Sequence, residues 1–361
     1  MIAYKSEVFM GQIILTAINA ILPIILLIAL GYFLKRIKFL SGGFLKAGNS
    51  LVFKVLLPIM LFVNIYDSDW SAFRWDLILY SLIVIIVIFG LGLLTCILTT
   101  KRADRRGVIL QCTFRSNFAI IGTSLAASLA GGSTSSAATV ALLQAFSIPT
   151  FNILAVISLS IFTDKPTAEE GLLIPEKNPK HSVKGILLGI IKNPLIIGVA
   201  LGLAFLGLRS AEVAIFGSVA FSIKGHLTFL YSALNQLKNI ASPFALIVLG
   251  GQFEFSAAKG MLKEIIVGTG WRIVIAPLIG IGIAVLLSQN TAILPLGTDE
   301  YPALVSLFAS PVAVSSAIMA SEMKNNDEQL ATQLVVWTSV GSILTIFITV
   351  CILMSAGLLA V

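Results

Sequence analysis

Charged residues are scarce in this 361-residue chain, in which Asp, Glu, Lys and Arg together make up 11%. A soluble domain carries about 25% of these residues, because its surface must interact with water. So few charges cannot cover a water-facing surface, and an exterior this apolar would aggregate in water. Hydrophobic residues make up 57% of the sequence. The composition therefore excludes a soluble globular protein and predicts an exterior that faces the lipid bilayer.

Residues that bind metals or carry out catalysis are also few. The two histidines, His181 and His226, lie in or near predicted loops without a cysteine or carboxylate at ligand spacing. We interpret Cys96, Cys112 and Cys351, which lie in apolar segments, as small buried hydrophobic residues. The sequence has no GxSxG, HExxH or P-loop motif. We therefore expect no enzyme activity, no bound metal and no cofactor.

Acidic residues are missing from the centres of the long apolar segments. Glu254 and Glu322 lie at the ends of such segments. A cation site or a proton relay within a membrane usually needs a carboxylate there. This pattern argues against sodium coupling and against proton coupling through the protein, although a substrate could itself carry a proton.

Long apolar runs dominate the rest of the sequence. A membrane-spanning helix needs about 20 consecutive, mostly apolar residues. This criterion gives ten candidate spans, at 13–34, 45–66, 76–99, 107–129, 137–162, 185–207, 228–250, 264–287, 302–321 and 330–355. The first is too long for a signal-peptide core and is interpreted as an uncleaved helix. The predicted fold class is an all-α membrane protein of about ten transmembrane helices.

Basic residues gather in alternate loops, after the first, third, fifth, seventh and ninth candidate spans. Loops on the cytoplasmic side of a membrane carry the excess of Lys and Arg. The pattern predicts a multi-pass protein of the cell membrane with both termini on the outer side. The net charge of +7 comes largely from these loops, which argues against nucleic acid as a partner.

The two halves of the chain resemble each other. The first candidate span contains Pro23-x5-Ala29-Leu30-Gly31, and the sixth contains Pro194-x5-Ala200-Leu201-Gly202. Phe, Ser and Ala also recur at equal offsets in 114–119 and 308–313, within spans four and nine. Because each half has an odd number of spans, the second would lie inverted in the membrane, as in many secondary transporters.

A polar segment divides these halves. Residues 164–184 include Pro166, Pro175 and Pro179, and we interpret them as a cytoplasmic linker. The predicted organisation is a five-helix repeat at 1–163, this linker, and an inverted five-helix repeat at 185–361.

Spans four and nine carry helix-boundary signals in their centres. In Ser310-Pro311, serine is a good N-cap and proline is favoured at the first helical position. Ser116-Asn117 gives a similar signal in span four. A break within lipid is tolerated only where the backbone lines a cavity or is buried in protein. Both spans are therefore predicted to be broken helices.

The new half-helices would begin near Phe118 and Val312, with free N–H groups at the membrane centre. Each helix N-terminus carries about half a positive charge. Two such ends facing each other predict an anion site that needs no formal cation. The alternative is that Pro311 only kinks a packed helix and that Asn117 caps a neighbour.

Three basic residues lie inside predicted spans: Lys54, Arg115 and Arg272. Lys54 is about ten residues from each end of its span and hence about 15 Å deep. Such a residue must face protein, water or an anion. Lys54 and Arg115 either add positive potential to a cavity or donate to backbone carbonyls of neighbouring helices. For Arg272 we favour the second interpretation.

In their order along the chain, these motifs resemble the auxin efflux carrier family, which includes plant auxin carriers and bacterial permeases for malate and malonate. The motifs are Leu51–Pro58 in span two, Arg115-Ser116-Asn117 followed by Gly122, Lys192-Asn193-Pro194, Pro243 followed by Gly250, and Ser310-Pro311.

The resemblance implies a scaffold of spans 1, 2, 6 and 7 and a moving domain of spans 3–5 and 8–10. It also implies that broken spans 4 and 9 cross and bind a substrate carboxylate, and that a homodimer can form through the scaffold. Asn117 matches the family's crossover asparagine, and Gln144 resembles a polar residue beside the site in plant members. Plant members carry an acidic-basic pair in span 3, whereas 77–83 carries no charge here, which argues against auxin as the substrate.

We therefore predict a secondary transporter of small organic anions, carboxylates above all, that works by elevator-type alternating access. Ser316, Asn152 and Pro149 are predicted beside the site. The alternatives are a sodium-coupled symporter of the bile-acid type and, in a different class, a membrane-embedded enzyme or structural subunit. The predicted substrate-binding residues are Lys54, Arg115, Ser116, Asn117, Phe118, Gln144, Ser310, Pro311, Val312 and Ser315.

Overall fold

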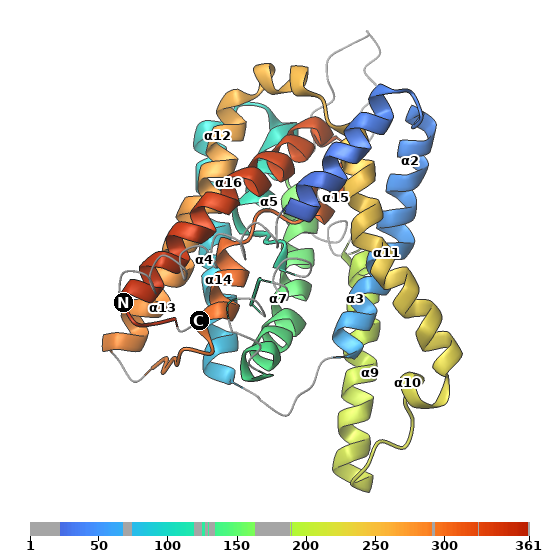
Figure 1. Cartoon of the computed structure of the whole chain (residues 1–361), viewed down its shortest axis with the longest axis vertical. Coiled ribbons are helices and arrows are strands. Elements are labelled where there is room, and N and C mark those ends of the chain that lie inside the picture. The colour runs from blue at the N-terminus through green and yellow to red at the C-terminus, as the bar shows by residue number, and fades with distance from the viewer. Residues whose placement is uncertain are drawn as a thin grey trace, which may run out of the picture.

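The structure is a computed structural model, and every regular element that it describes is helical (Figure 1). The residues described are 22–67, 74–118, 125, 126, 129, 134–162, 188, 190–290, 293–323 and 325–359. Six helices are long and apolar enough to cross a membrane: Gly42–Tyr66, Trp75–Thr99, Leu142–Ser160, Pro194–Phe216, Leu262–Asn290 and Glu328–Ser355. The chain is thus an all-α membrane protein, as predicted.

One group of helices forms the right-hand side of Figure 1. In this group α3 packs against both α9 and α11, and α11 packs against α2. Its members are helical residues 22–36, α2 (Gly42–Leu51), the π-turn η1 (Val52–Leu56), α3 (Leu57–Tyr66), α9 (Pro194–Phe216), α10 (Ile223–His226) and α11 (Thr228–Gln252). We call these elements the α3 group.

A second group, which we call the α5 group, lies beside the first. Here α5 packs against α4, α7 and α12, while α16 packs against α12, α14 and α15. Its members are α4 (Trp75–Thr99), α5 (Ala103–Phe114), α7 (Thr134–Ser160), the 3-10 turn η4 (Phe255–Gly260), α12 (Leu262–Gly270), the π-turn η5 (Trp271–Ile275), α13 (Ala276–Asn290), α14 (Tyr301–Ala309), α15 (Val314–Glu322) and α16 (Glu328–Ser355).

Both π-turns lie just before a proline inside a long helix. Pro58 follows η1, and Pro277 follows η5. Proline cannot donate to the helix ladder, and its ring clashes with the carbonyl four residues earlier. A π-turn gives that carbonyl room while the helix continues, which explains why each helix remains unbroken. The second π-turn contains Arg272.

Most predicted spans agree with helices in the structure, but the sixth, 185–207, misses a break in the helix at Lys192 and Asn193 and ends nine residues too early. The helix α9 begins at Pro194, where the Asn193 side chain accepts a hydrogen bond from the Leu195 N–H at 2.9 Å. It ends at Phe216, because Gly217 has a φ of 71° and takes the left-handed conformation. The capping residues, rather than hydropathy, set these limits. Residues 13–21 of the first predicted span and the whole predicted linker, 164–184, lie outside the described residues.

Glycines allow the closest helix approaches within the α3 group. A Cβ added to Gly31 would lie 2.0 Å from the Ile247 carbonyl oxygen, and one added to Gly250 would lie 2.0 Å from that of Ile28. Residues 22–36 and α11 therefore touch backbone to backbone, as small residues permit in membrane proteins. In the same way, a Cβ on Gly202 of α9 would lie 3.0 Å from the Phe62 carbonyl oxygen of α3.

Candidate functional site

Two extended segments meet and pair in the middle of the α5 group. The first follows α5, which ends at Phe114, and the second follows α14, which ends at Ala309. The Asn117 N–H donates to the Pro311 carbonyl at 2.8 Å, and the Ala313 N–H donates to the Arg115 carbonyl at 3.0 Å. These bonds make an antiparallel bridge centred on Ser116 and Val312. We call the paired segments, 115–118 and 310–313, the crossover.

The breaks lie where the sequence predicts them, but the backbone N–H groups there are mostly paired. Besides the two bridge bonds, the Val312 N–H donates to the Thr338 hydroxyl at 3.2 Å. The prediction of free N–H groups at Val312 and Ala313 is therefore wrong, because Thr338 accepts from the first and the Arg115 carbonyl accepts from the second. The N–H groups of Val314 and Ser315, in the first turn of α15, find no acceptor among the described residues. Residues 119–124, where the other half-helix was predicted to begin, are outside the described part of the chain.

Ser310 does not cap the helix that follows it, which corrects the prediction. It ends α14 instead, and its hydroxyl donates to the Ser306 carbonyl at 2.6 Å. A residue before proline is biased toward extended conformations, and Ser310 has φ −62° and ψ 148°. The chain stays extended through the bridge, so α15 begins only at Val314.

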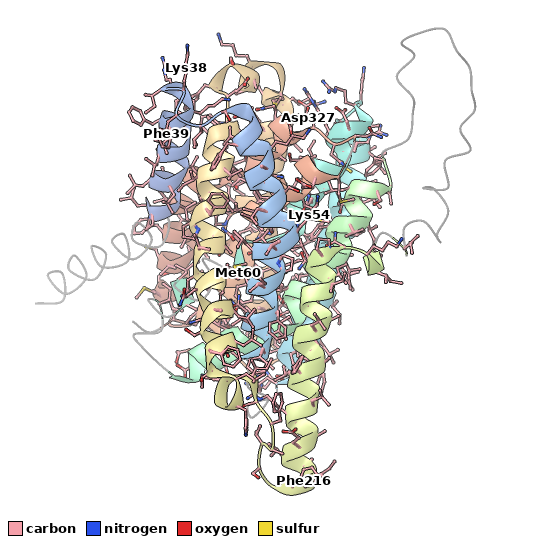
Figure 2. The ribbon with its side chains drawn as sticks, turned by 90° about the vertical axis from the view of Figure 1, so that its right-hand side faces the viewer. Lys38, Phe39, Lys54, Met60, Phe216 and Asp327 are labelled. Atoms are coloured by element: carbon pink, nitrogen blue, oxygen red, sulfur yellow. The ribbon has the colours of Figure 1, made fainter. Side chains whose placement is uncertain are left out.

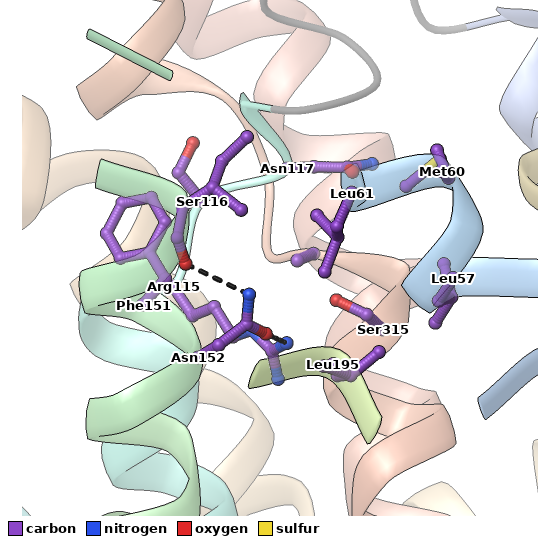
Figure 3. Close-up of a pocket in the computed structure, with 12 residues that line it drawn as sticks. Leu57, Met60, Leu61, Arg115, Ser116, Asn117, Phe151, Asn152, Leu195 and Ser315 are labelled. Atoms are coloured by element: carbon purple, nitrogen blue, oxygen red, sulfur yellow. Dashed lines mark hydrogen bonds between the residues drawn. The ribbon is translucent and has the colours of Figure 1, made fainter. Parts of the chain in front are cut away.

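A cavity of about 40 Å³ lies beside the crossover, between the α3 group and the α5 group (Figure 3). By volume it holds a few water molecules or a group of similar size. Its apolar wall on the side of the α3 group comes from α3 and α9, and its polar wall comes from the crossover, α7 and α15. The lining residues are Leu57, Met60, Leu61, Arg115, Ser116, Asn117, Ile148, Phe151, Asn152, Leu195, Ala313 and Ser315.

Arg115 is the cation of this cavity, and it is 2% exposed. Its guanidinium donates to the Asn152 Oδ1 at 2.7 Å and to the Gln111 Oε1, and one Nη lies 3.4 Å from the Met319 sulfur. Figure 3 shows the contact with Asn152 at the cavity wall. All of these partners are neutral, and no described carboxylate pairs with this arginine. The charge of Arg115 is thus uncompensated by the part of the protein that is described.

Two polar groups beside Arg115 lack partners. The Asn117 Nδ2 and the Ser116 Oγ are buried and form no hydrogen bond with any described residue. Leaving a buried polar group unsatisfied costs about 1–3 kcal/mol. Ser315 also lines the cavity, opposite Asn152 in Figure 3. The arrangement is a small cavity with an apolar wall, a fixed positive charge and hydrogen-bond donors in excess, which favours an anion.

Lys54 does not line this cavity, contrary to the prediction. It lies in η1, its side chain is 62% exposed, and its Nζ is 3.9 Å from the Glu322 Oε2 at the end of α15. Figure 2 shows Lys54 above Met60 along the same continuous helix. The depth of Lys54 in its span was predicted from its distance in residues to the ends of the span. That distance does not say which side of the helix faces the cavity, which is why the prediction is wrong.

Of the remaining predicted residues, Gln144 contacts the crossover, and the other three belong to it. Gln144 donates from its Nε2 to the Phe118 carbonyl at 2.8 Å. Phe118, Pro311 and Val312 belong to the crossover but do not line the cavity. Gln144 therefore holds the end of the first extended segment in place.

The interpretation of Arg272 as a donor to backbone carbonyls is confirmed. Two of its acceptors are the carbonyls of Phe114 and Ser310, at the two segments of the crossover. The sequence analysis did not anticipate this location. It also missed the apolar cavity wall, because Leu57, Met60, Leu61 and Leu195 have no motif that distinguishes them from other residues facing neighbouring helices.

Comparison with known proteins identifies the family of the chain. The model of the membrane transport protein family matches residues 16–350. No curated protein matches the chain significantly. Within the described residues, no group of three His, Cys, Asp or Glu side chains could hold a metal ion. The match covers nearly the whole chain, including both segments of the crossover, and the apolar helices agree with it. The chain therefore belongs to the membrane transport protein family, the family of auxin efflux carriers and related permeases.

Proposed function

We propose that this protein is a secondary transporter that moves small organic anions, carboxylates above all, across the cell membrane. The observation that carries the proposal is Arg115, a buried cation with only neutral described partners, beside the unpartnered amide of Asn117. An uncompensated buried charge is costly, so a ligand anion that neutralises it gains much of that free energy on binding. A carboxylate could accept from Arg115, Asn117 and Ser315 together.

The place of the cavity supports an alternating-access mechanism. It lies between the two helix groups, and the wall from α3 and α9 consists of Leu57, Met60, Leu61 and Leu195. An apolar wall without directional bonds permits the polar wall to slide past it. In this proposal the α3 group is the scaffold, and the α5 group carries the anion as an elevator.

Close helix contacts support an inverted repeat, with halves at 1–163 and 185–361 joined by 164–184. Span one touches span seven through Gly31 and Ile247, and span six touches span two through Gly202 and Phe62. If span six repeats span one and span seven repeats span two, these two contacts are equivalent. Both termini then lie on the outer side, as the loop charges predict.

Ion pairs at the two ends of the α5 group support the same repeat. Arg74, before α4, pairs with Glu300, before α14, at 2.9 Å. Arg105, in α5, pairs with Glu264, in α12, at 3.0 Å. The first pair joins the beginnings of spans three and nine, and the second joins those of spans eight and four. In an inverted repeat, span three corresponds to span eight and span four to span nine. The two ion pairs are then equivalent, with acidic and basic residues exchanged.

Flux in proteoliposomes tests the proposed function. The purified full-length protein is reconstituted, and uptake of labelled malate, malonate and indole-acetate is measured against empty liposomes. We expect saturable flux of at least one of these anions and a large loss of that flux in Asn117→Ala. Arg209→Gln is a matched control, since Arg209 also donates to a backbone carbonyl, that of Tyr66, but lies far along α9 from the cavity. Unchanged flux in Asn117→Ala refutes the site assignment, and flux that requires sodium favours the sodium-symporter alternative.

A further inference from the structure

Arg272 binds backbone carbonyls where each of the two extended segments of the crossover leaves its helix. Its Nε donates to the Ser310 carbonyl at 3.0 Å, and its Nη1 donates to the carbonyls of Thr113 and Phe114 at 3.3 and 3.1 Å. Its Nη2 donates to the carbonyls of Leu307, at 3.4 Å, and Phe308. A guanidinium has five N–H donors, so these five carbonyls use all of them. Arg272 is 1% exposed.

The carbonyls that Arg272 binds are the last ones of two helices. Thr113 and Phe114 end α5, while Leu307 and Phe308 lie in the last turn of α14. The final carbonyls of a helix have no partner within it, and each helix C-terminus carries about half a negative charge. The two ends together therefore present about one negative charge, which the guanidinium neutralises. No carboxylate among the described residues shares this cation.

Clusters of carbonyls at the ends of broken helices are where transporters coordinate sodium ions. Here the same kind of cluster is already filled by a side chain of the protein. Without a cation at this place, the two negative helix ends would oppose the positive charge of the nearby Arg115, which directly follows α5, and weaken its attraction for an anion.

We propose that Arg272 is a resident cation of the crossover, which occupies the carbonyl cluster that a metal ion would otherwise bind and so makes anion binding in the cavity independent of sodium. The inference rests on the proposed function as regards the anion, but the cation-binding property of the carbonyl cluster can be tested apart from transport. Arg272 is a positioning residue in this account, because it touches the crossover and not the cavity.

Thermal unfolding of the full-length protein tests the cation property directly. The midpoint is measured for the wild type, Arg272→Gln, Arg272→Lys and the control Arg209→Gln, in N-methylglucamine, sodium and millimolar guanidinium. We expect the midpoint of Arg272→Gln to be low in N-methylglucamine and to rise with sodium or guanidinium, which can occupy the emptied cluster. The wild type and Arg209→Gln should not respond to either cation.

Flux and binding of a labelled anion, malonate or whichever of the three is transported, give the second readout. We expect wild-type flux to be equal in sodium and N-methylglucamine. In Arg272→Gln we expect binding to weaken about tenfold in N-methylglucamine and to recover partly with sodium or guanidinium. A role in folding alone would not produce recovery by a cation.

Two results overturn the inference. One is that sodium stabilises or activates the wild type. The other is that folded Arg272→Gln has the unfolding midpoint of the wild type and that neither sodium nor guanidinium changes it. If Arg272→Gln does not fold, Arg272→Lys decides, because lysine keeps the charge with fewer donors. The unfolding midpoint of Arg272→Lys should then lie below that of the wild type and be insensitive to sodium. A sodium response of Arg272→Lys contradicts the proposal. If the wild type transports none of the anions, the proposed function fails while the unfolding experiment still decides the role of Arg272.

Discussion

Two buried arginines lie at one crossover, and their surroundings differ in kind. Arg272 donates only to backbone carbonyls, which cannot move without unfolding the helix ends that carry them. Arg115 donates to the side chains of Gln111 and Asn152, and it faces a cavity. Side chains can change rotamer when a ligand arrives, whereas helix ends cannot. The comparison teaches that equally buried charges can have different kinds of partner: fixed backbone carbonyls around Arg272, and side chains and a cavity around Arg115.

The largest expected effect separates the arginines by stability. Arg272→Gln should lower the free energy of unfolding by about 3–5 kcal/mol, the cost of removing one partner from a buried charged network. Arg115→Gln should cost much less, because its neutral partners can pair with the new amide. Unfolding monitored by intrinsic fluorescence of both variants checks this difference, and equal losses would break the comparison.

Arg115→Gln should instead act on binding. Loss of one partner of a buried charged contact costs about 2–5 kcal/mol, and each 1.4 kcal/mol is about tenfold in affinity. We therefore expect the dissociation constant of the transported anion to rise roughly 30-fold or more. Equilibrium binding to the purified protein measures it, with Arg209→Gln as the control, and an unchanged constant would remove Arg115 from the site.

Asn117→Ala should weaken binding and yet leave the empty protein stable. The Asn117 amide nitrogen has no partner among the described residues, so its removal takes away an unsatisfied donor. We expect an unchanged or slightly higher unfolding midpoint without ligand, together with about tenfold weaker anion binding. A clearly lower midpoint in ligand-free protein would show that the amide is used for folding.

The smallest effect is expected at Lys54. Its contact with Glu322 is long, at 3.9 Å, and the lysine side chain is 62% exposed. Exposed ion pairs contribute about 0–1 kcal/mol. Lys54→Gln should therefore change anion affinity by less than about twofold, in contrast to Arg115→Gln. A large loss of affinity would mean that Lys54 reaches the cavity in another conformation of the protein.

The sequence predicted the all-α membrane class and the place of the crossover, because apolar runs and the Ser116-Asn117 and Ser310-Pro311 signals are local. It predicted Ser310 as the cap of the following helix, which is wrong, since serine before proline suits both the start of a helix and an extended segment. It placed Lys54 in the cavity, because depth in a span can be counted from sequence whereas the direction of a side chain depends on the packing of the helix.

The apolar wall of the cavity and the carbonyl cluster around Arg272 were beyond sequence analysis for a related reason. Leu61 and Leu195 become neighbours only when α3 and α9 pack together. The five carbonyl partners of Arg272 come from segments that are far apart in the chain. Backbone groups carry no sequence signal, so the sequence could favour carbonyl donation for Arg272 but could not say which carbonyls it binds.

Equilibrium binding of labelled malate, malonate and indole-acetate to purified wild-type protein and Arg115→Gln, in sodium and in N-methylglucamine, tests the central claim most directly. The account predicts saturable binding of at least one anion to the wild type, equal in both cations, and roughly 30-fold or greater weakening in folded Arg115→Gln. Saturable binding that is undiminished in folded Arg115→Gln would contradict it, because the anion would then bind somewhere other than the cavity beside the crossover.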